Sequence, residues 1–148
     1  MPLKIKNMVW LVIFLQLFAN SCKDNTKHPE AESIPSIDKS FLAFYEQYSK
    51  DSLFQLEHTV FPLEGMKARH DENDMIDPDF RWTQENWVFQ KEFDDLNGSF
   101  TREFYNLNGV IVEKIADKSG NFTMERRFGK LSSGWHLIYY REMGMNGK

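Results

Sequence analysis

The sequence contains a single cysteine, Cys22, among its 148 residues, so no disulfide can form within the chain. It also lacks the run of about 20 apolar residues that a membrane-spanning helix requires, because its longest such run covers only residues 8–19. Basic residues number 18 against 22 acidic ones. This acidic balance argues against a partner that is a nucleic acid or an anionic membrane surface.

Recognisable catalytic and metal-binding motifs are also missing. There is no Gly-x-Ser-x-Gly element, and the acidic stretch that begins at Asp71 has Ile76 where a calcium loop needs glycine. The four histidines lie far apart and no pair has metal-ligand spacing: His28, His58, His70 and His136. We therefore predict no catalytic set, no metal and no cofactor. A non-enzymatic protein is favoured, although the question of enzymatic activity stays open.

The amino end has the pattern of a secretory signal. Lys4 and Lys6 precede the apolar run of residues 8–19, which ends in Ala19-Asn20-Ser21-Cys22. This ending resembles a lipobox, where a bacterial lipoprotein is diacylated on cysteine and cleaved, although Asn20 stands where the pattern prefers a small or aliphatic residue. Two acyl chains would suffice for stable membrane anchoring. The alternative is an uncleaved amino-terminal anchor with a chance cysteine.

These features predict four segments. Residues 1–21 are a lipoprotein signal peptide, residues 22–35 a polar, disordered tether, residues 36–143 one domain and residues 144–148 a disordered tail. We expect a lipid-anchored protein of the bacterial cell envelope, held in the outer membrane through Cys22. The charged pair Lys23-Asp24 resembles the export signal of lipoproteins that reach the cell surface, so surface exposure is an expectation as well.

Two helices are predicted at the start of the domain. The first follows a cap at Ser36 or Asp38, and the second follows Asp51 and includes residues 53–57. The first carries an apolar stripe at helical spacing, which comprises Ile37, Phe41, Phe44, Tyr45 and Tyr48.

Short strands are predicted at residues 59–63 and 80–82, and Thr83 is predicted to cap a brief helix that ends at Trp87. Asn108-Gly109 joins two β-rich runs, which is a strong hairpin signal. Two further strands, residues 122–128 and 135–140, complete an antiparallel meander. Helices followed by strands predict an α+β fold, in which amino-terminal helices pack on one face of a curved antiparallel sheet.

Several aromatic segments resemble an uncharacterised lipoprotein domain family of Bacteroidetes-type bacteria, a domain of unknown function. They are Phe41-Leu42-Ala43-Phe44-Tyr45, Asp51-Ser52-Leu53-Phe54-Gln55, Val60-Phe61-Pro62-Leu63, Thr83-Gln84-Glu85-Asn86-Trp87, Phe128-Gly129-Lys130 and the stretch from Gly134 to Tyr140. The resemblance covers about residues 36–143. It implies a cystatin-like, nuclear transport factor 2-like cone with a cavity at its wide end, and no particular chemistry.

Five residues are weak candidates for lining such a pocket: Tyr45, His58, Trp82, Trp87 and Arg126. Arg126 is the most informative because it falls on the otherwise apolar side of its predicted strand, where a charge must be paired or exposed. The alternative is that Arg126 reaches solvent. For the tryptophans the alternative is core packing, and for His58 it is a capping or surface position.

Three functional hypotheses follow from these observations. The leading hypothesis is an envelope lipoprotein whose domain binds a small ligand or a partner, because aromatic residues are abundant and a catalytic set is missing. The second is a small enzyme with an acid/base residue inside the cone, such as His58. The third is a structural or inhibitory partner of another envelope protein, which an exposed apolar patch would favour.

Overall fold

The computed structural model describes residues 37–146. The predicted signal peptide, Cys22 and the tether therefore lie outside the described residues. The described residues belong to one compact unit, Ser33–Lys148. Within residues 37–146, no helix combines the length and apolar character needed to cross a membrane.

Two helices begin at the predicted caps. Helix α2 spans Lys39–Tyr48, and the Asp38 side chain accepts a hydrogen bond from the Ser40 amide at 2.9 Å. Helix α3 spans Ser52–Glu57, and the Asp51 carboxylate accepts from the first amides of that helix. The predicted aromatic stripe of α2 is buried at Phe41, Phe44, Tyr45 and Tyr48. Both helix predictions are confirmed, and each helix begins at a predicted cap.

Six strands form one curved sheet in the order β2-β1-β6-β5-β4-β3. They are β1 Thr59–Met66, β2 Arg81–Trp82, β3 Phe100–Leu107, β4 Val110–Asp117, β5 Phe122–Leu131 and β6 Gly134–Met145. The predicted α+β class is confirmed. The prediction of an all-antiparallel sheet is wrong at one pair, because β1 and β6 run parallel. These two strands are far apart in the sequence, so no tight turn forces them to be antiparallel.

The hairpin between β3 and β4 turns at Asn108 and Gly109, whose φ angles are 52° and 91°. Both values lie in the left-handed region that a tight hairpin turn requires, which confirms the Asn-Gly prediction. Strand β6 extends past the predicted domain end at residue 143. It reaches Met145, since Thr123 pairs with Gly144 and the Met145 amide donates to the Arg69 carbonyl.

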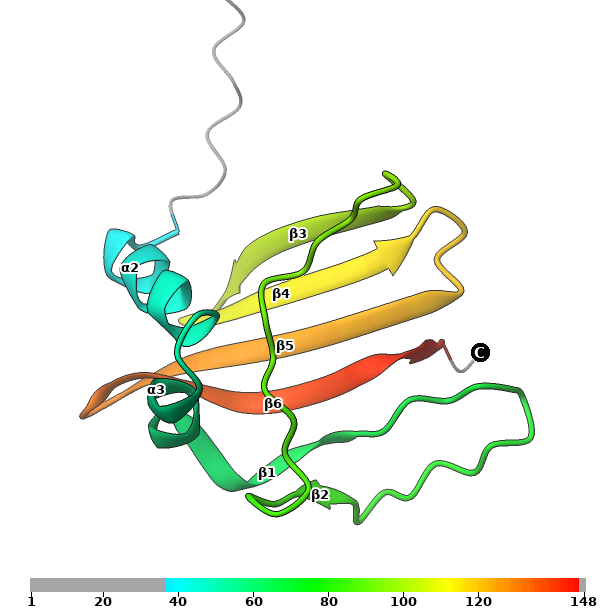
Figure 1. The fold of residues 1–148 in the computed structure, drawn as a ribbon, viewed down its shortest axis with the longest axis horizontal. Helices are drawn as coiled ribbons and strands as arrows, with labels where there is room; N and C mark the ends of the chain where they lie inside the picture. The colour runs from blue at the N-terminus through cyan, green and yellow to red at the C-terminus, as the bar shows by residue number, and fades with distance from the viewer. Residues whose placement is uncertain (1–36, 147–148) are drawn as a thin grey trace, which may run out of the picture. The chain divides into compact units, whose positions relative to one another are not determined.

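The predicted helix from Thr83 to Trp87 is absent from the structure. A turn occupies residues 84–86, in which the Thr83 amide donates to the Asn86 side-chain oxygen at 2.8 Å. The chain then continues without regular secondary structure and crosses the face of the sheet from the β2 side to the β3 side (Figure 1). We call residues 87–95 of this crossing segment the strap.

The core lies between the sheet and the elements that cover one of its faces. Phe41 of α2 packs against Phe128 of β5 and Trp135 of β6, with ring centroids 5.3 and 5.2 Å apart. Tyr45 packs edge-on against Phe104 of β3. Helix α2 and the strap therefore cover the same face of the sheet, and polar side chains on that face are buried beneath them.

Candidate functional site

A row of ionisable side chains crosses the middle of the covered face. Arg102, Glu113 and Arg126 come from the neighbouring strands β3, β4 and β5, and Glu113 lies directly opposite Arg126 in the strand register. Each is flanked, two positions away on its own strand, by apolar residues: Phe100 and Phe104, Ile111 and Ile115, Met124 and Phe128. Since side chains at alternate positions share a face, the ionisable row runs through an otherwise apolar surface.

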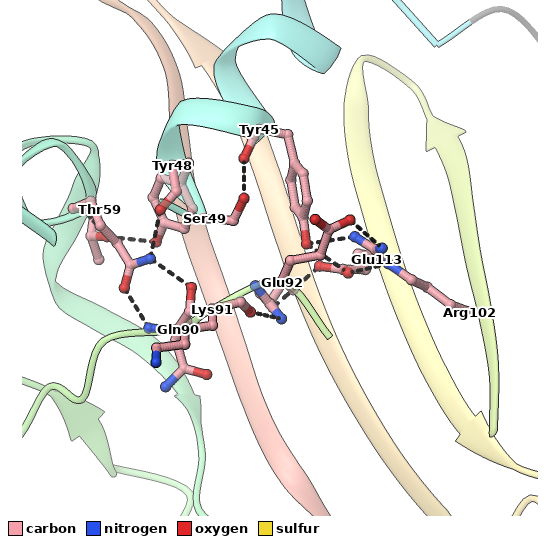
Figure 2. A network of polar contacts seen from close by, with 11 residues as sticks. Tyr45, Tyr48, Ser49, Thr59, Gln90, Lys91, Glu92, Arg102 and Glu113 are labelled. Atoms are coloured by element: carbon pink, nitrogen blue, oxygen red, sulfur yellow. Dashed lines mark hydrogen bonds and ion pairs between the residues drawn. The ribbon is translucent and has the colours of Figure 1, made fainter. Parts of the chain in front are cut away.

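Glu113 is the centre of this cluster. Its Oε1 atom accepts hydrogen bonds from the Tyr45 hydroxyl at 2.9 Å and from Arg102 Nε at 2.8 Å. Its Oε2 atom lies 3.2 Å from Arg126 Nε. Arg102 also donates to the Tyr45 hydroxyl oxygen at 2.8 Å and to Glu92 of the strap at 3.0 Å. Figure 2 shows Tyr45 of α2 and Arg102 converging on the Glu113 carboxylate.

Burial sets the electrostatics of the cluster. The side chains of Glu113 and Arg126 are 0% and 2% exposed, so neither charge is screened by water. Losing one partner of such a pair leaves an uncompensated buried charge. Burial also raises the pKa of the Tyr45 phenol well above its usual value. Tyr45 is therefore protonated at neutral pH and acts as a donor to Glu113.

Arg126 has donors without acceptors. Its Nη2 atom donates to the Lys91 carbonyl of the strap at 3.4 Å, whereas Nε and Nη1 are buried and have no hydrogen-bond partner within residues 37–146. Nε lies within ion-pair distance of Glu113 Oε2, but the two atoms are not aligned for a hydrogen bond. Buried polar atoms of this kind are uncommon and call for a specific explanation.

A second polar cluster holds the strap in place. The fully buried Gln55 side chain of α3 donates to the Tyr48 carbonyl at 2.8 Å and to the Gln90 carbonyl at 2.9 Å. Its oxygen accepts from the Gln90 amide at 2.8 Å and from Trp87 Nε1 at 3.1 Å. All of these bonds are made by one amide group, which uses both of its N–H donors and both of its oxygen lone pairs. Gln55 therefore fixes the strap to α2 and α3.

The structure brings together two of the five predicted site residues, Tyr45 and Arg126, through Glu113. Trp82 and Trp87 form a separate pair with ring centroids 6.1 Å apart, and both pack against Tyr140. His58 lies in a third group and stacks on Phe54 at 3.8 Å. The alternative of a solvent-exposed Arg126 is wrong, since the residue is 1% exposed. A pocket lined by all five residues stays a prediction.

Two open spaces lie at other places on the described part of the chain. A pocket of about 210 Å³ lies at the end of β1, between apolar residues such as Met66 and Phe80 and the basic residues Lys67 and Arg69. A wider depression of about 640 Å³ lies near the start of β6, where Trp135 is part of its lining. None of the five predicted site residues lines either space.

Sequence reasoning missed Glu113, Arg102 and Gln55. The signal for the first two was present in the sequence, because each lies midway between apolar residues at alternate positions of its strand, as Arg126 does. Three neighbouring strands with the same interruption indicate one shared polar row. No comparable signal exists for Gln55, because its partner Gln90 lies 35 residues away in a segment without a periodic pattern.

No protein-family model matches the sequence, and no curated protein matches it. Among solved structures, the chain is similar to an NTF2-like protein from Bacteroides fragilis, with 17% sequence identity and a TM-score of 0.46. The similarity covers 72% of this chain and 47% of that protein, so the chain spans less than half of that protein's length. The function is therefore inferred from the geometry of the site itself.

Proposed function

We propose that the protein is a lipid-anchored envelope protein whose domain binds a small polar ligand on the covered face of the sheet, beneath the strap. The observation that carries this proposal is Arg126, which is 1% exposed and has two buried nitrogen atoms, Nε and Nη1, that make no hydrogen bond within residues 37–146. A guanidinium group in a dry interior binds an oxygen ligand more strongly than it would in water. A ligand oxygen beside Arg126 would satisfy these donors.

The ligand class follows from the surroundings of Arg126. The donors are guanidinium N–H groups, and the walls are aromatic rings such as those of Tyr48 and Phe128, which pack edge-on at 5.5 Å. This combination fits a small molecule that carries a carboxylate or hydroxyl oxygen on an apolar body. The charges of Glu92, Arg102, Glu113 and Arg126 sum to zero, so a ligand that binds through a neutral hydroxyl or a protonated carboxyl group leaves the cluster without net charge.

The ligand would reach Arg126 by displacing the strap. The strap has no regular secondary structure, and side chains from the sheet and from α3 hold it mainly through its backbone at Gln90 and Lys91. Val88 is 68% exposed, so this part of the strap is only lightly packed. Segments with few buried contacts open at lower free energy than the rest of a domain. Opening of the strap would expose Arg126 to a ligand without unfolding the sheet.

The lipid anchor is the second part of the proposal. Cys22 follows an apolar run and precedes polar residues, which supports diacylation of its thiol and attachment to the outer membrane. The nuclear transport factor 2-like cone is the architecture that we propose for the domain. The curved sheet and the helices on one of its faces support it.

The test is a thermal-shift screen of the full chain in detergent against small carboxylic acids, sugar acids and hydroxylated aromatics. We expect at least one class to raise the melting temperature of the wild type. Because Arg126→Ala alone deprives the buried Glu113 of one of its two arginine partners, the matched variant is Glu113→Gln with Arg126→Met, which removes both charges at similar volume. The proposal fails if no compound stabilises the wild type, or if the double variant responds equally.

A further inference from the structure

Two histidines that are far apart in the sequence lie side by side. His58 follows α3 directly, and His136 is the third residue of β6. The parallel pairing of β1 with β6 brings them together, since Thr59 is opposite Leu137 and the Leu137 amide donates to the His58 carbonyl at 2.8 Å. The two imidazole ring centroids are 5.1 Å apart. Neither ring contributes to the cluster around Glu113.

Backbone carbonyls fix the same tautomer in both rings. Nδ1 of His58 lies 2.9 Å from the Phe54 carbonyl, and Nδ1 of His136 lies 3.0 Å from the Gly134 carbonyl. A carbonyl oxygen only accepts, so each Nδ1 carries the proton and each neutral ring has its lone pair on Nε2. The Ser133 hydroxyl, 3.4 Å from His136 Nε2, is the one hydrogen-bond neighbour of either Nε2 atom within residues 37–146.

This arrangement matches the way proteins prepare histidine for a metal ion. Metal-binding imidazoles generally donate the N–H of their other nitrogen to a carbonyl or carboxylate, which fixes ring orientation. Two imidazoles that bind one tetrahedral ion at about 2.1 Å through Nε2 have their ring centroids about 5 Å apart. The observed separation of 5.1 Å agrees with that geometry.

We propose that His58 and His136 form a binding site for a late transition-metal dication, with both Nε2 atoms as ligands. No group of three histidine, cysteine or acidic ligands occurs among the described residues, so water molecules would complete the coordination. Two imidazoles without a carboxylate select ions that favour nitrogen over hard oxygen-seeking ions such as calcium or magnesium. Affinity should follow the order Cu²⁺ above Ni²⁺ and Zn²⁺. The site is independent of the ligand proposed beneath the strap.

The test uses the full chain in detergent, in a His28→Ala, His70→Ala background that removes the other two histidines. Titration with Cu²⁺, followed by calorimetry and by electron paramagnetic resonance, should show one ion per chain with two equatorial nitrogens. His58→Phe keeps an aromatic ring against Phe54, and His136→Phe keeps a ring beside it. Each substitution should weaken binding at least about tenfold and leave one equatorial nitrogen.

Ser133→Ala is the matched control, because it removes the hydroxyl near Nε2 of His136 and keeps both imidazoles. It should retain the two-nitrogen signal and an affinity within about threefold of the parent. The proposal is overturned if Cu²⁺ does not bind, if the parent shows one nitrogen or none, or if His58→Phe and His136→Phe bind as tightly as the parent. A loss of binding in Ser133→Ala equal to that in the histidine variants would also overturn it.

Discussion

Glu113 of β4 and Arg126 of β5 are directly opposite each other in the sheet, and their charged groups lie 3.2 Å apart where neither reaches solvent. The pair is tied to three separate parts of the fold. Tyr45 connects it to α2, Arg102 connects it to β3, and the Lys91 carbonyl connects it to the strap. One cross-strand pair therefore contacts α2, β3 and the strap at the same point of the sheet.

Replacing Glu113 by alanine should lower the free energy of unfolding by about 3–5 kcal/mol, because Arg126 would stay buried without its counter-charge. Denaturant unfolding followed by circular dichroism measures the change. Glu103→Ala is the control, since Glu103 is exposed on the neighbouring strand and should cost less than about 1 kcal/mol. Equal losses in the two variants would show that the buried pair has no special role.

Replacing Gln55 by alanine should release the strap. The Gln90 amide and Trp87 Nε1 both lose their acceptor, which removes about 1–3 kcal/mol of local stability. Hydrogen exchange measured by mass spectrometry should become faster in peptides that contain residues 87–95, whereas peptides from β4 and β5 should be little affected. Gln47→Ala changes an exposed glutamine of α2 and should leave exchange of the strap as in the wild type. Unchanged exchange in Gln55→Ala would contradict the role of Gln55.

Stability should fall at alkaline pH. Burial raises the pKa of Tyr140 to about 12 and raises the pKa values of Tyr45 and Tyr48 further. Below about pH 10 these phenols are protonated in both the folded and the unfolded chain, so their burial contributes fully to the free energy of unfolding. Above that pH the unfolded chain loses these protons and the folded chain retains them, which favours unfolding up to and beyond pH 12.

Urea midpoints measured between about pH 8 and pH 12 should therefore decline above pH 10. Tyr140→Phe removes one of the three phenols and should make the decline shallower. A midpoint that is independent of pH over this range would show that these hydroxyls ionise as readily in the folded chain as in the unfolded chain.

Labelling with a clickable fatty acid in a bacterial host should mark the wild type and leave Cys22→Ala unlabelled, because this chain has no other cysteine to carry a diacylglycerol thioether. In cell fractionation, the variant should be absent from the membrane pellet or should appear as an uncleaved precursor. Ser21→Ala keeps a small residue before the cysteine and should be labelled as the wild type is. Equal labelling of wild type and Cys22→Ala would rule out lipidation at this residue.

The sequence predicted what depends on local signals. Asp38 and Asp51 cap the two helices as expected, and Asn108-Gly109 turns the first hairpin, because each signal lies within a few residues of the structure that it determines. The position of Arg126 on the apolar side of β5 was also readable from strand alternation, which left pairing and exposure as alternatives, and the structure shows a buried pair with Glu113.

The features that were missed depend on long-range contacts. The parallel β1–β6 pair joins segments at opposite ends of the domain, and no local pattern specifies its direction. The helix expected from Thr83 is replaced in the structure by a turn over residues 84–86. Trp87 and Gln90 then bond to Gln55 of α3. The aromatic residues of this segment contribute to the core through those contacts and not through a helical stripe.

The way in which the strap is held has a consequence for how this chain tolerates mutation. The Gln55 side chain forms hydrogen bonds with both the backbone N–H and the backbone carbonyl of Gln90, and Arg126 donates to the carbonyl of Lys91. Every amino acid except proline offers the same two main-chain groups, so the side chains at positions 90 and 91 are free to vary. In a saturation library, most substitutions at positions 90 and 91 should therefore give a folded protein, whereas nearly all substitutions at Gln55 and Arg126 should not.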